Sequence, residues 1–311
     1  MQPIHNVAIV GSGHIGQKYK ALLQRMPHVS IKAVVASPTA ALHQNLIEQQ
    51  DIDAVVIAET DSNPLQLIDT AIKADKFVFC GHHILPLMKI DLSSSSILTN
   101  LIDENHVKLQ IGFRRRFDPH YAYLKKQIEE GMVGNIHIVK ITNRYDAVTE
   151  LPTGKHDTFM FNMHDFDMAH FITGQMVDEV FAMTTAKYQD ASVITLRMKN
   201  GAFVIIDSSP SVNYGNDQRL EVFGEKGALI VDNLSLTNTH HYSHRGVMTE
   251  KPSAKLDDRY QHAYQAQLHA FFNSLTHGKQ VMMPTAKDVI VAIRVAEAAQ
   301  CSVIENRPVK V

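Results

Sequence analysis

A glycine-rich turn near the start of the chain limits the possible folds more than any other feature. An apolar run over residues 4–10 leads into it, and a helical apolar stripe begins at about Ile15. Between a strand and a helix, the first glycine allows a tight turn, the second lets backbone N–H groups approach a pyrophosphate, and the third permits close helix–strand packing. The pattern predicts a dinucleotide-binding α/β unit whose phosphate-binding residues are Gly11, Ser12, Gly13, His14, Ile15 and Gly16.

The first part of the chain alternates apolar strands with amphipathic helices. Strands are expected at 29–35, 54–58, 77–80 and 108–113, and helices at 15–26, 39–50, 65–73 and 93–105. Continuous apolar strands of this kind belong to a parallel sheet that is covered on both faces. Since 311 residues are enough for two domains, we assign residues 1–116 to a Rossmann-like, doubly wound domain.

The rest of the chain, 117–311, has a different pattern. A helix is expected at 121–131, a half-exposed strand at 135–144, and β-rich runs at 179–187, 192–198, 202–208, 218–223 and 228–231. Two further helices are expected at 260–275 and 286–304. The predicted fold class is therefore α/β plus α+β, in which the second domain is built on a large, mostly antiparallel open sheet.

The adenine half of the first domain looks shortened. A carboxylate that holds the ribose is expected about 20 residues after the glycine turn, but Ala36 and Ser37 stand there. The next eight residues contain no Arg or Lys that could hold a 2′-phosphate. Only about 15 residues separate Ser37 from Asp53, so one edge strand is expected to be missing. Two interpretations stay open: Ser37 contacts a bound dinucleotide, or the scaffold has little or no affinity for one.

Several longer stretches carry a family resemblance. They are IGFRRRFDP at 111–119, GMVGNI at 131–136, HDFDM at 164–168, DQRLEVFG at 217–224, and the C-terminal residues from 263 to 309. On these the chain resembles the glucose-fructose oxidoreductase/inositol dehydrogenase (Gfo/Idh/MocA) family, and most of all its inositol 2-dehydrogenase branch. The resemblance implies NAD or NADP as cofactor, hydride transfer to or from a sugar, inositol or related polyol, and a homodimer or homotetramer formed through the C-terminal sheet.

The resemblance also implies a catalytic set, of which this chain keeps a part. Family members use a His as base, a Lys from a Glu-Lys-Pro motif, and an Asp four residues before the His. His164 matches the base, whereas His82 stands at the position of the Lys and Met160 at that of the Asp. A protonated His82 could polarise a hydroxyl in place of the Lys. We therefore name His164 and His82 as the catalytic candidates.

Substrate-binding positions follow from the same resemblance. Asp167 matches a substrate-binding carboxylate three residues after the base, and Asn216 stands where a substrate-side Tyr is expected. Arg144 and Tyr145 lie at a strand end that often carries a substrate-binding Asn or Asp. Because several of these positions differ from the family pattern, the alternative is a catalytically inactive relative that binds a sugar-like ligand or has a structural role.

Composition excludes other classes of function. Thirty Lys and Arg against 32 Asp and Glu give a net charge of −2, which provides no electrostatic case for nucleic acid or an acidic membrane. No run approaches the ~20 apolar residues of a membrane span, and we expect no signal peptide. Two cysteines, Cys80 and Cys301, make no disulfide framework. We therefore expect a cytoplasmic protein.

Two clusters of charged or metal-binding residue types are given structural interpretations. His240, His241 and His244 are expected in a solvated loop, and no metal site is predicted from them. The arginines at 114–116 fall at the junction of the two domains, where pairing across the domain interface is favoured over phosphate binding.

Overall fold

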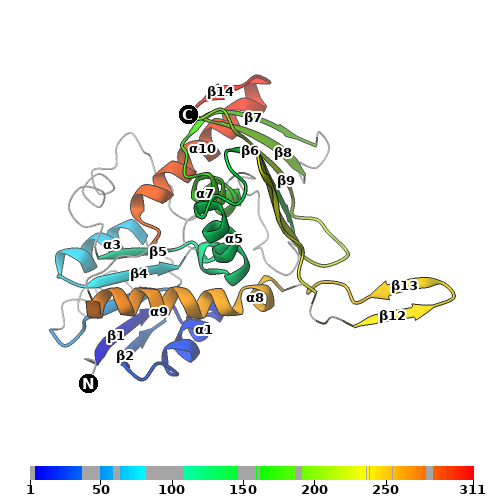
Figure 1. Cartoon of the computed structure of the whole chain (residues 1–311). Coiled ribbons are helices and arrows are strands. Elements are labelled where there is room, and N and C mark those ends of the chain that lie inside the picture. Colours follow the sequence, from blue (N-terminus) through cyan, green and yellow to red (C-terminus); the bar gives the residue numbers. More distant parts are fainter. Residues whose placement is uncertain are drawn as a thin grey trace. The chain divides into compact units, whose positions relative to one another are not determined.

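The computed structural model describes most of the chain as two compact units (Figure 1). One unit contains Met1–Arg114 and Tyr264–Val291, and the other contains Arg115–Ala263 and Ala292–Val311. The sequence-based division at residue 116 lies close to the first of these boundaries, but it left 264–291 with the second domain. The described residues are 4–36, 50–58, 64–81, 108–145, 159, 162–185, 191–235, 237, 239–253, 255–277 and 283–311.

The first unit contains a parallel sheet of five strands. They are β1 (His5–Val10), β2 (Val29–Val35), β3 (Ala54–Ile57), β4 (Phe77–Gly81) and β5 (Leu109–Gly112), in the order β2-β1-β3-β4-β5. Every neighbouring pair is parallel. The inner strand β3 and the edge strand β5 are buried along their whole length, as a sheet covered on both faces requires. The predicted parallel sheet is confirmed.

The strand order places a topological switch point beside β1. From β1 the chain passes through α1 (His14–Leu23) to β2 on one side, and β3 lies on the other side. Ligands of such sheets bind in the crevice at the carboxyl ends of the two strands that flank this reversal. Gly11 follows β1 and Ala58 follows β3 at that edge. Within the described part of the chain no strand lies outside β2; residues 37–49, on which the expectation of a missing edge strand depends, are not among those described.

The second unit contains a larger mixed sheet (Figure 1). Its strands are β6 (Ile136–Arg144), β7 (Val177–Thr184), β8 (Ser192–Met198), β9 (Phe203–Ser209), β10 (Asp217–Gly224), β11 (Gly227–Val231) and β14 (Val309–Lys310). They run in the order β11-β10-β6-β9-β8-β7-β14, and only β6 and β9 are parallel neighbours. The mostly antiparallel open sheet predicted from the sequence is therefore confirmed.

The two faces of this sheet differ in character. In β8, Ile194 and Leu196 are buried whereas Val193 and Arg197 are exposed, so side chains alternate between a core face and an open face. The open face carries a cross-strand apolar row, because Phe203 of β9 and Phe223 of β10 both pair with Ile138 of the strand between them. Exposed apolar side chains of this kind are typical of an association surface.

Helices of the second unit include three that the sequence pattern did not predict. The helices that belong wholly to this unit are α5 (Pro119–Glu129), α7 (Met163–Thr173) and α8 (Leu256–Arg259). The boundaries between the units fall within three others, the 3-10 turn η2 (Arg114–Phe117), α9 (Gln261–His277) and α10 (Ala286–Glu305). The first unit also contains α3 (Pro64–Lys73). The three unpredicted helices are η2, α7 and α8. The longest of these three, α7, is buried almost all round and so lacks an amphipathic stripe. No helix in the described ranges has both the length and the apolarity needed to cross a bilayer.

The histidine-rich segment is a hairpin, so the expected loop was wrong. Strands β12 (His240–Ser243) and β13 (Gly246–Thr249) pair with each other and are exposed along their whole length. Successive strand residues point to opposite faces, so His240 and His241 cannot converge on one ion. Among the described residues no group of His, Cys, Asp and Glu side chains could hold a metal ion.

Candidate functional site

The glycine turn has the geometry that its sequence requires. Gly11 adopts a positive φ of 105°, which a side chain would strain. A Cβ on Gly16 would lie 2.1 Å from the carbonyl oxygen of Gly11, so this position accepts only glycine without a shift of the backbone. The turn thus brings the start of α1 directly against the end of β1.

The start of α1 suits an anionic group. Gly13 is the N-cap residue in extended conformation (φ −72°, ψ −160°), it supplies no side-chain cap, and the first turn contains no acidic residue. A helix N-terminus carries partial positive charge and backbone N–H donors, which favour a phosphate. The residues present therefore fit the pyrophosphate of a dinucleotide, and Gly11, Gly13 and Gly16 would hold it. Ser37, which was expected near the ribose, lies outside the described residues.

His164 lies at the start of α7, in the second position after the N-cap residue Asn162. The helix ends at Gly174, which adopts the left-handed conformation (φ 64°) that glycine favours. His164 is half-buried and its Nδ1 atom is fully buried. Nε2 is therefore the ring nitrogen that a substrate could reach.

Two aspartates follow His164, and each is held by an arginine of η2. Arg115 Nη1 donates to Asp165, and both side chains are buried. Arg116 Nε lies 3.1 and 3.0 Å from the two carboxylate oxygens of Asp167, which is also buried. Both pairs lie within the second compact unit, because its first boundary falls between Arg114 and Arg115. With the predicted boundary after residue 116, the same two pairs join the two predicted domains.

The Arg115 guanidinium stays charged inside the core. Burial lowers the pKa of the Arg115 guanidinium, but Tyr260 and Asp165 raise it, and the net shift is upward. Asp167 stands three residues after His164 and hence on the same side of α7. The structure therefore brings together two of the predicted site residues, the candidate base and the candidate substrate carboxylate.

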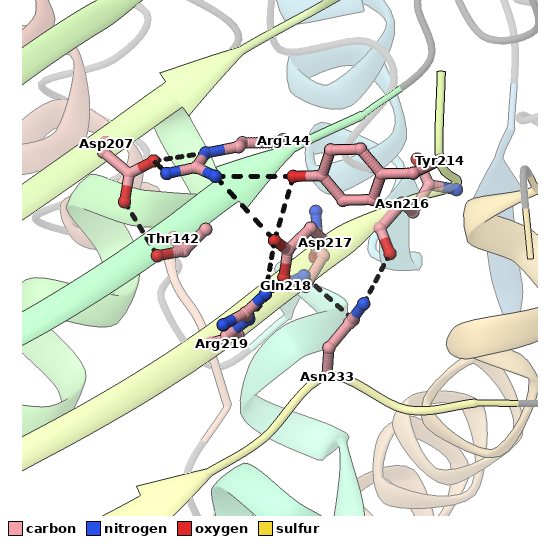
Figure 2. A network of polar contacts seen from close by, with 9 residues as sticks. All are labelled: Thr142, Arg144, Asp207, Tyr214, Asn216, Asp217, Gln218, Arg219 and Asn233. Carbon is pink, nitrogen blue, oxygen red and sulfur yellow. Dashed lines mark hydrogen bonds and ion pairs between the residues drawn. The ribbon is translucent and has the colours of Figure 1, made fainter. Parts of the chain in front are cut away.

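Arg144 belongs to a different network (Figure 2). Its Nε donates to Asp207 at 2.6 Å, its Nη1 donates to the Tyr214 hydroxyl at 3.4 Å, and Asp217 lies 4.0 Å away. Side chains alternate along β6, so Arg144 points to the face opposite that of its neighbour Asn143. Asn143 donates to Asp165 of α7. The structure thus brings Asn143, and not Arg144, to the helix that carries His164.

Tyr145 and Asn216 are both buried in the second unit. The backbone N–H of Tyr145 donates to the Ser209 carbonyl at 2.9 Å and so continues the pairing of β6 with β9. The Asn216 side chain donates to the Ser253 carbonyl at 3.0 Å. The backbone carbonyl of Asn216 accepts from the Asn233 side chain at 2.8 Å (Figure 2). These contacts tie the start of β10 to residues 233 and 253, and they leave the predicted substrate contacts as proposals.

The sequence analysis missed two buried polar residues that are linked to α7 by hydrogen bonds, Asn143 directly and Gln218 through Asn143. Asn143 and Gln218 are paired in register on β6 and β10, and both side chains are buried on the core face. A signal was available, since each is a polar residue at an inward position of a predicted strand. His82 and Met160 lie outside the described residues. The pairing of His82 with His164 therefore stays a prediction.

Comparison with known proteins gives one consistent result. A family model for the C-terminal α/β domain of the Gfo/Idh/MocA oxidoreductases matches residues 125–311. The chain is 32% identical to the uncharacterized oxidoreductase YrbE of Bacillus subtilis, over 97% of this chain and 95% of that protein. It is also 32% identical to the myo-inositol 2-dehydrogenase of Thermotoga maritima, over 85% of this chain and 81% of that protein. The crystal structure of a probable dehydrogenase from Thermotoga maritima matches with a TM-score of 0.87 at 28% identity, covering 98% of both chains.

Proposed function

Because the chain belongs to the Gfo/Idh/MocA oxidoreductase family, we propose that it is a nicotinamide-dependent dehydrogenase of inositol-like polyols. The observation that carries the proposal is the glycine turn at the switch point of the parallel sheet, which leads into the N-terminus of α1 with Gly13 as its N-cap residue. The similarity to a myo-inositol 2-dehydrogenase supports a cyclic polyol as substrate.

The cofactor proposal is NAD. Gly11, Gly13 and Gly16 would hold its pyrophosphate, and the nicotinamide, when bound, supplies the hydride acceptor or donor. Residues 38–45 contain no Lys or Arg, so they offer no cation for the 2′-phosphate of NADP.

His164 is the proposed general base. Oxidation of a secondary alcohol requires a group that takes the hydroxyl proton as the hydride leaves, and a neutral imidazole does this at physiological pH. Nε2 of His164 accepts the proton, while the buried Nδ1 side of the ring stays packed in the protein. Asp167, on the same side of α7, orients the substrate together with its partner Arg116. His82, at the position of the family lysine, completes the proposal as the group that polarises the hydroxyl.

Self-association through the open face of the large sheet is part of the same proposal. Phe203, Ile138 and Phe223 form a row across three neighbouring strands of this face. The two phenylalanines are exposed, and covering them would bury apolar area that water now contacts.

A second candidate function is an inactive relative that binds a sugar-like ligand. It is favoured by the sequence at the catalytic positions, where Gly81-His82-His83 replaces Glu-Lys-Pro and Met160 replaces Asp. This candidate needs no dinucleotide, which makes the two functions easy to separate.

Titration of the purified protein with NADH and with NADPH, followed by nicotinamide fluorescence and thermal melting, is the test. We expect saturable NADH binding with a dissociation constant of about 1–100 μM, near the usual range for cofactor and substrate sites, and NAD-dependent oxidation in a panel of inositol isomers. No binding of either nucleotide at millimolar concentration would contradict the dehydrogenase and favour the inactive relative.

A further inference from the structure

We propose that a buried chain of hydrogen bonds, running from Tyr260 to Asp165, positions His164 for proton transfer. The inference rests on the proposed function, because it assigns this hydrogen-bond chain a role in setting the geometry of the base. The residues of the chain touch neither substrate nor cofactor in this account; they are positioning residues.

The chain crosses the core of the second unit in three steps. The Tyr260 hydroxyl donates to Gln218 Oε1, Gln218 Nε2 donates to Asn143 Oδ1 at 2.5 Å, and Asn143 Nδ2 donates to Asp165 Oδ2 at 2.6 Å. Every donor faces toward the carboxylate, so each amide has one orientation that satisfies both neighbours. Hydrogen bonds aligned in one direction polarise one another and strengthen the whole series.

The Asp165 carboxylate is the point at which this chain meets two other donors. Asn162 Nδ2 donates to Oδ2 at 2.8 Å, and Arg115 Nη1 donates to Oδ1. The carboxylate is completely buried, and its three donors come from β6, from the N-cap position of α7 and from η2. The Asp165 carboxylate thus has one cation and two amide donors around it inside the core.

This arrangement fixes the first turn of α7. Helix starts are usually held by the side chain of the N-cap residue, which accepts hydrogen bonds from the first backbone N–H groups. Asn162 does not cap in this manner and instead donates to the carboxylate three residues later. The first turn is thus tied through Asp165 to the neighbouring elements. His164 is the residue directly before Asp165. The position of the His164 Cα relative to β6 and β10 therefore depends on the hydrogen-bond chain.

Stability alone does not account for such a network. Apolar side chains of similar volume commonly stabilise a core as well as a buried ion pair does, because they avoid the desolvation of charged and polar groups. The hydrogen-bond chain instead fixes the orientation of the first turn of α7. A proton acceptor such as His164 needs a fixed orientation, whereas a residue that only packs in the core does not. Catalytic groups must be held within about 0.5 Å of their productive position.

Tyr260→Phe and Gln218→Met test the inference at two points of the chain. The first removes a single hydroxyl, three hydrogen bonds from Asp165, and the second breaks the chain at its middle. We expect kcat for polyol oxidation to fall about fivefold or more in each, the equivalent of one net hydrogen bond. KM and the dissociation constant of NADH should stay within about twofold of the wild-type values, since binding groups are unchanged. Tyr121→Phe is the matched control, because Tyr121 is also a buried tyrosine but lies outside the chain.

A second readout does not depend on activity. Diethyl pyrocarbonate acylates accessible imidazole nitrogens, and peptide mass spectrometry reports its rate at His164 relative to His170 of the same helix. We expect the ratio of rates to change about threefold or more in both chain variants and to stay constant in Tyr121→Phe. Wild-type kcat with an unchanged ratio in both variants would overturn the inference. If the wild-type protein oxidises no polyol, the proposed function fails and the ratio of rates alone decides whether the chain positions His164.

Discussion

Arg116 holds the carboxylate of Asp167 with two of its nitrogens: Nε lies 3.1 and 3.0 Å from the two oxygens, and Nη2 lies 2.5 Å from Oδ1. The Asp167 side chain is 1% exposed and that of Arg116 9%. The candidate substrate carboxylate is therefore already half of a buried ion pair. Its removal has consequences for folding as well as for substrate binding.

Asp167→Asn is expected to destabilise the protein strongly. Removing one partner of a buried pair leaves the other charge buried without compensation, which typically costs about 3–5 kcal/mol. Urea unfolding followed by circular dichroism measures the change in the free energy of unfolding. Asp178→Asn is the matched control, because the pair of Asp178 with Lys310 is exposed and its loss should leave stability nearly unchanged. Equal stability of the two variants would show that Asp167 is not a member of a buried pair in solution.

The sequence predicted elements well where a pattern of apolar residues dictates them. Strands β2 and β8 have the predicted bounds, because each is a β-branched run between turn signals. Helix α7 was missed for the opposite reason: it is enclosed by protein, so its apolar residues have no period.

The candidate site shows the same limit. His164 and Asp167 could be named from a motif, since the motif fixes their identity and spacing. Choosing between Asn143 and Arg144 required the face on which each lies, and a shift of one residue reverses every side chain of a strand. The pairing of Asn143 with Gln218 fixes that register, and it joins strands 75 residues apart in the chain. The alternation along β6 can indicate that Asn143 points inward, but no local pattern contains its pairing with Gln218.

Gly13→Asp is expected to weaken dinucleotide binding and to stabilise the unliganded protein. Gly13 is exposed, in the extended conformation of an N-cap residue, and Asp is among the best N-cap residues. The gain should be about 0.5 kcal/mol, measured as a higher melting temperature. The same carboxylate would repel the pyrophosphate, so NADH affinity should fall about 100-fold or more.

Gly13→Asn separates charge from shape in this test. Asn caps a helix almost as well as Asp and has the same size, so it should keep the gain in stability and lose less affinity. Unchanged NADH affinity in Gly13→Asp would show that the helix start is not the phosphate site.

Gly16→Ala is expected to destabilise the first unit. The added Cβ would meet the Gly11 carbonyl oxygen at 2.1 Å, a distance that forces backbone to move. Strain of this kind costs about 1–3 kcal/mol, measurable by thermal or urea unfolding. Gly13→Ser is the control, since Gly13 is exposed and extended and Ser is a favoured N-cap residue. A Gly16→Ala protein as stable as the wild type would contradict the close packing of α1 against the end of β1.

Because Cys80 is buried, we expect the free energy of unfolding to fall at high pH. Burial raises the pKa of the Cys80 thiol from 9.0 to about 12, so the folded protein keeps a proton that the unfolded chain releases. The stabilisation is complete below pH 9 and falls as the pH rises from 9 toward 12, by at most about 1.4 kcal/mol per pH unit. Urea unfolding of the wild type and of Cys80→Ala at pH 8 and pH 10.5 measures the difference. The fall should be smaller in Cys80→Ala, whereas Cys301→Ala, which removes an exposed thiol, should behave as the wild type. A parallel fall in all three proteins would mean that Cys80 is not buried in solution.

Phe223→Glu tests whether the open face of the large sheet is an association surface. Phe223 is 47% exposed and pairs across β6 and β10 with Ile138, which in turn pairs with Phe203. A carboxylate at this end of the row would be buried without a partner in any assembly that covers it, at a cost of several kcal/mol. Light scattering after size-exclusion chromatography should show an oligomer for the wild type and a smaller species for the variant. Glu221 lies on the same face two residues earlier and is half-exposed beside Lys140, so Glu221→Gln, which keeps the size of the side chain, serves as the control and should leave the mass unchanged. A wild-type protein that is monomeric at micromolar concentration, or a Phe223→Glu variant with the wild-type mass, would exclude this face as the contact.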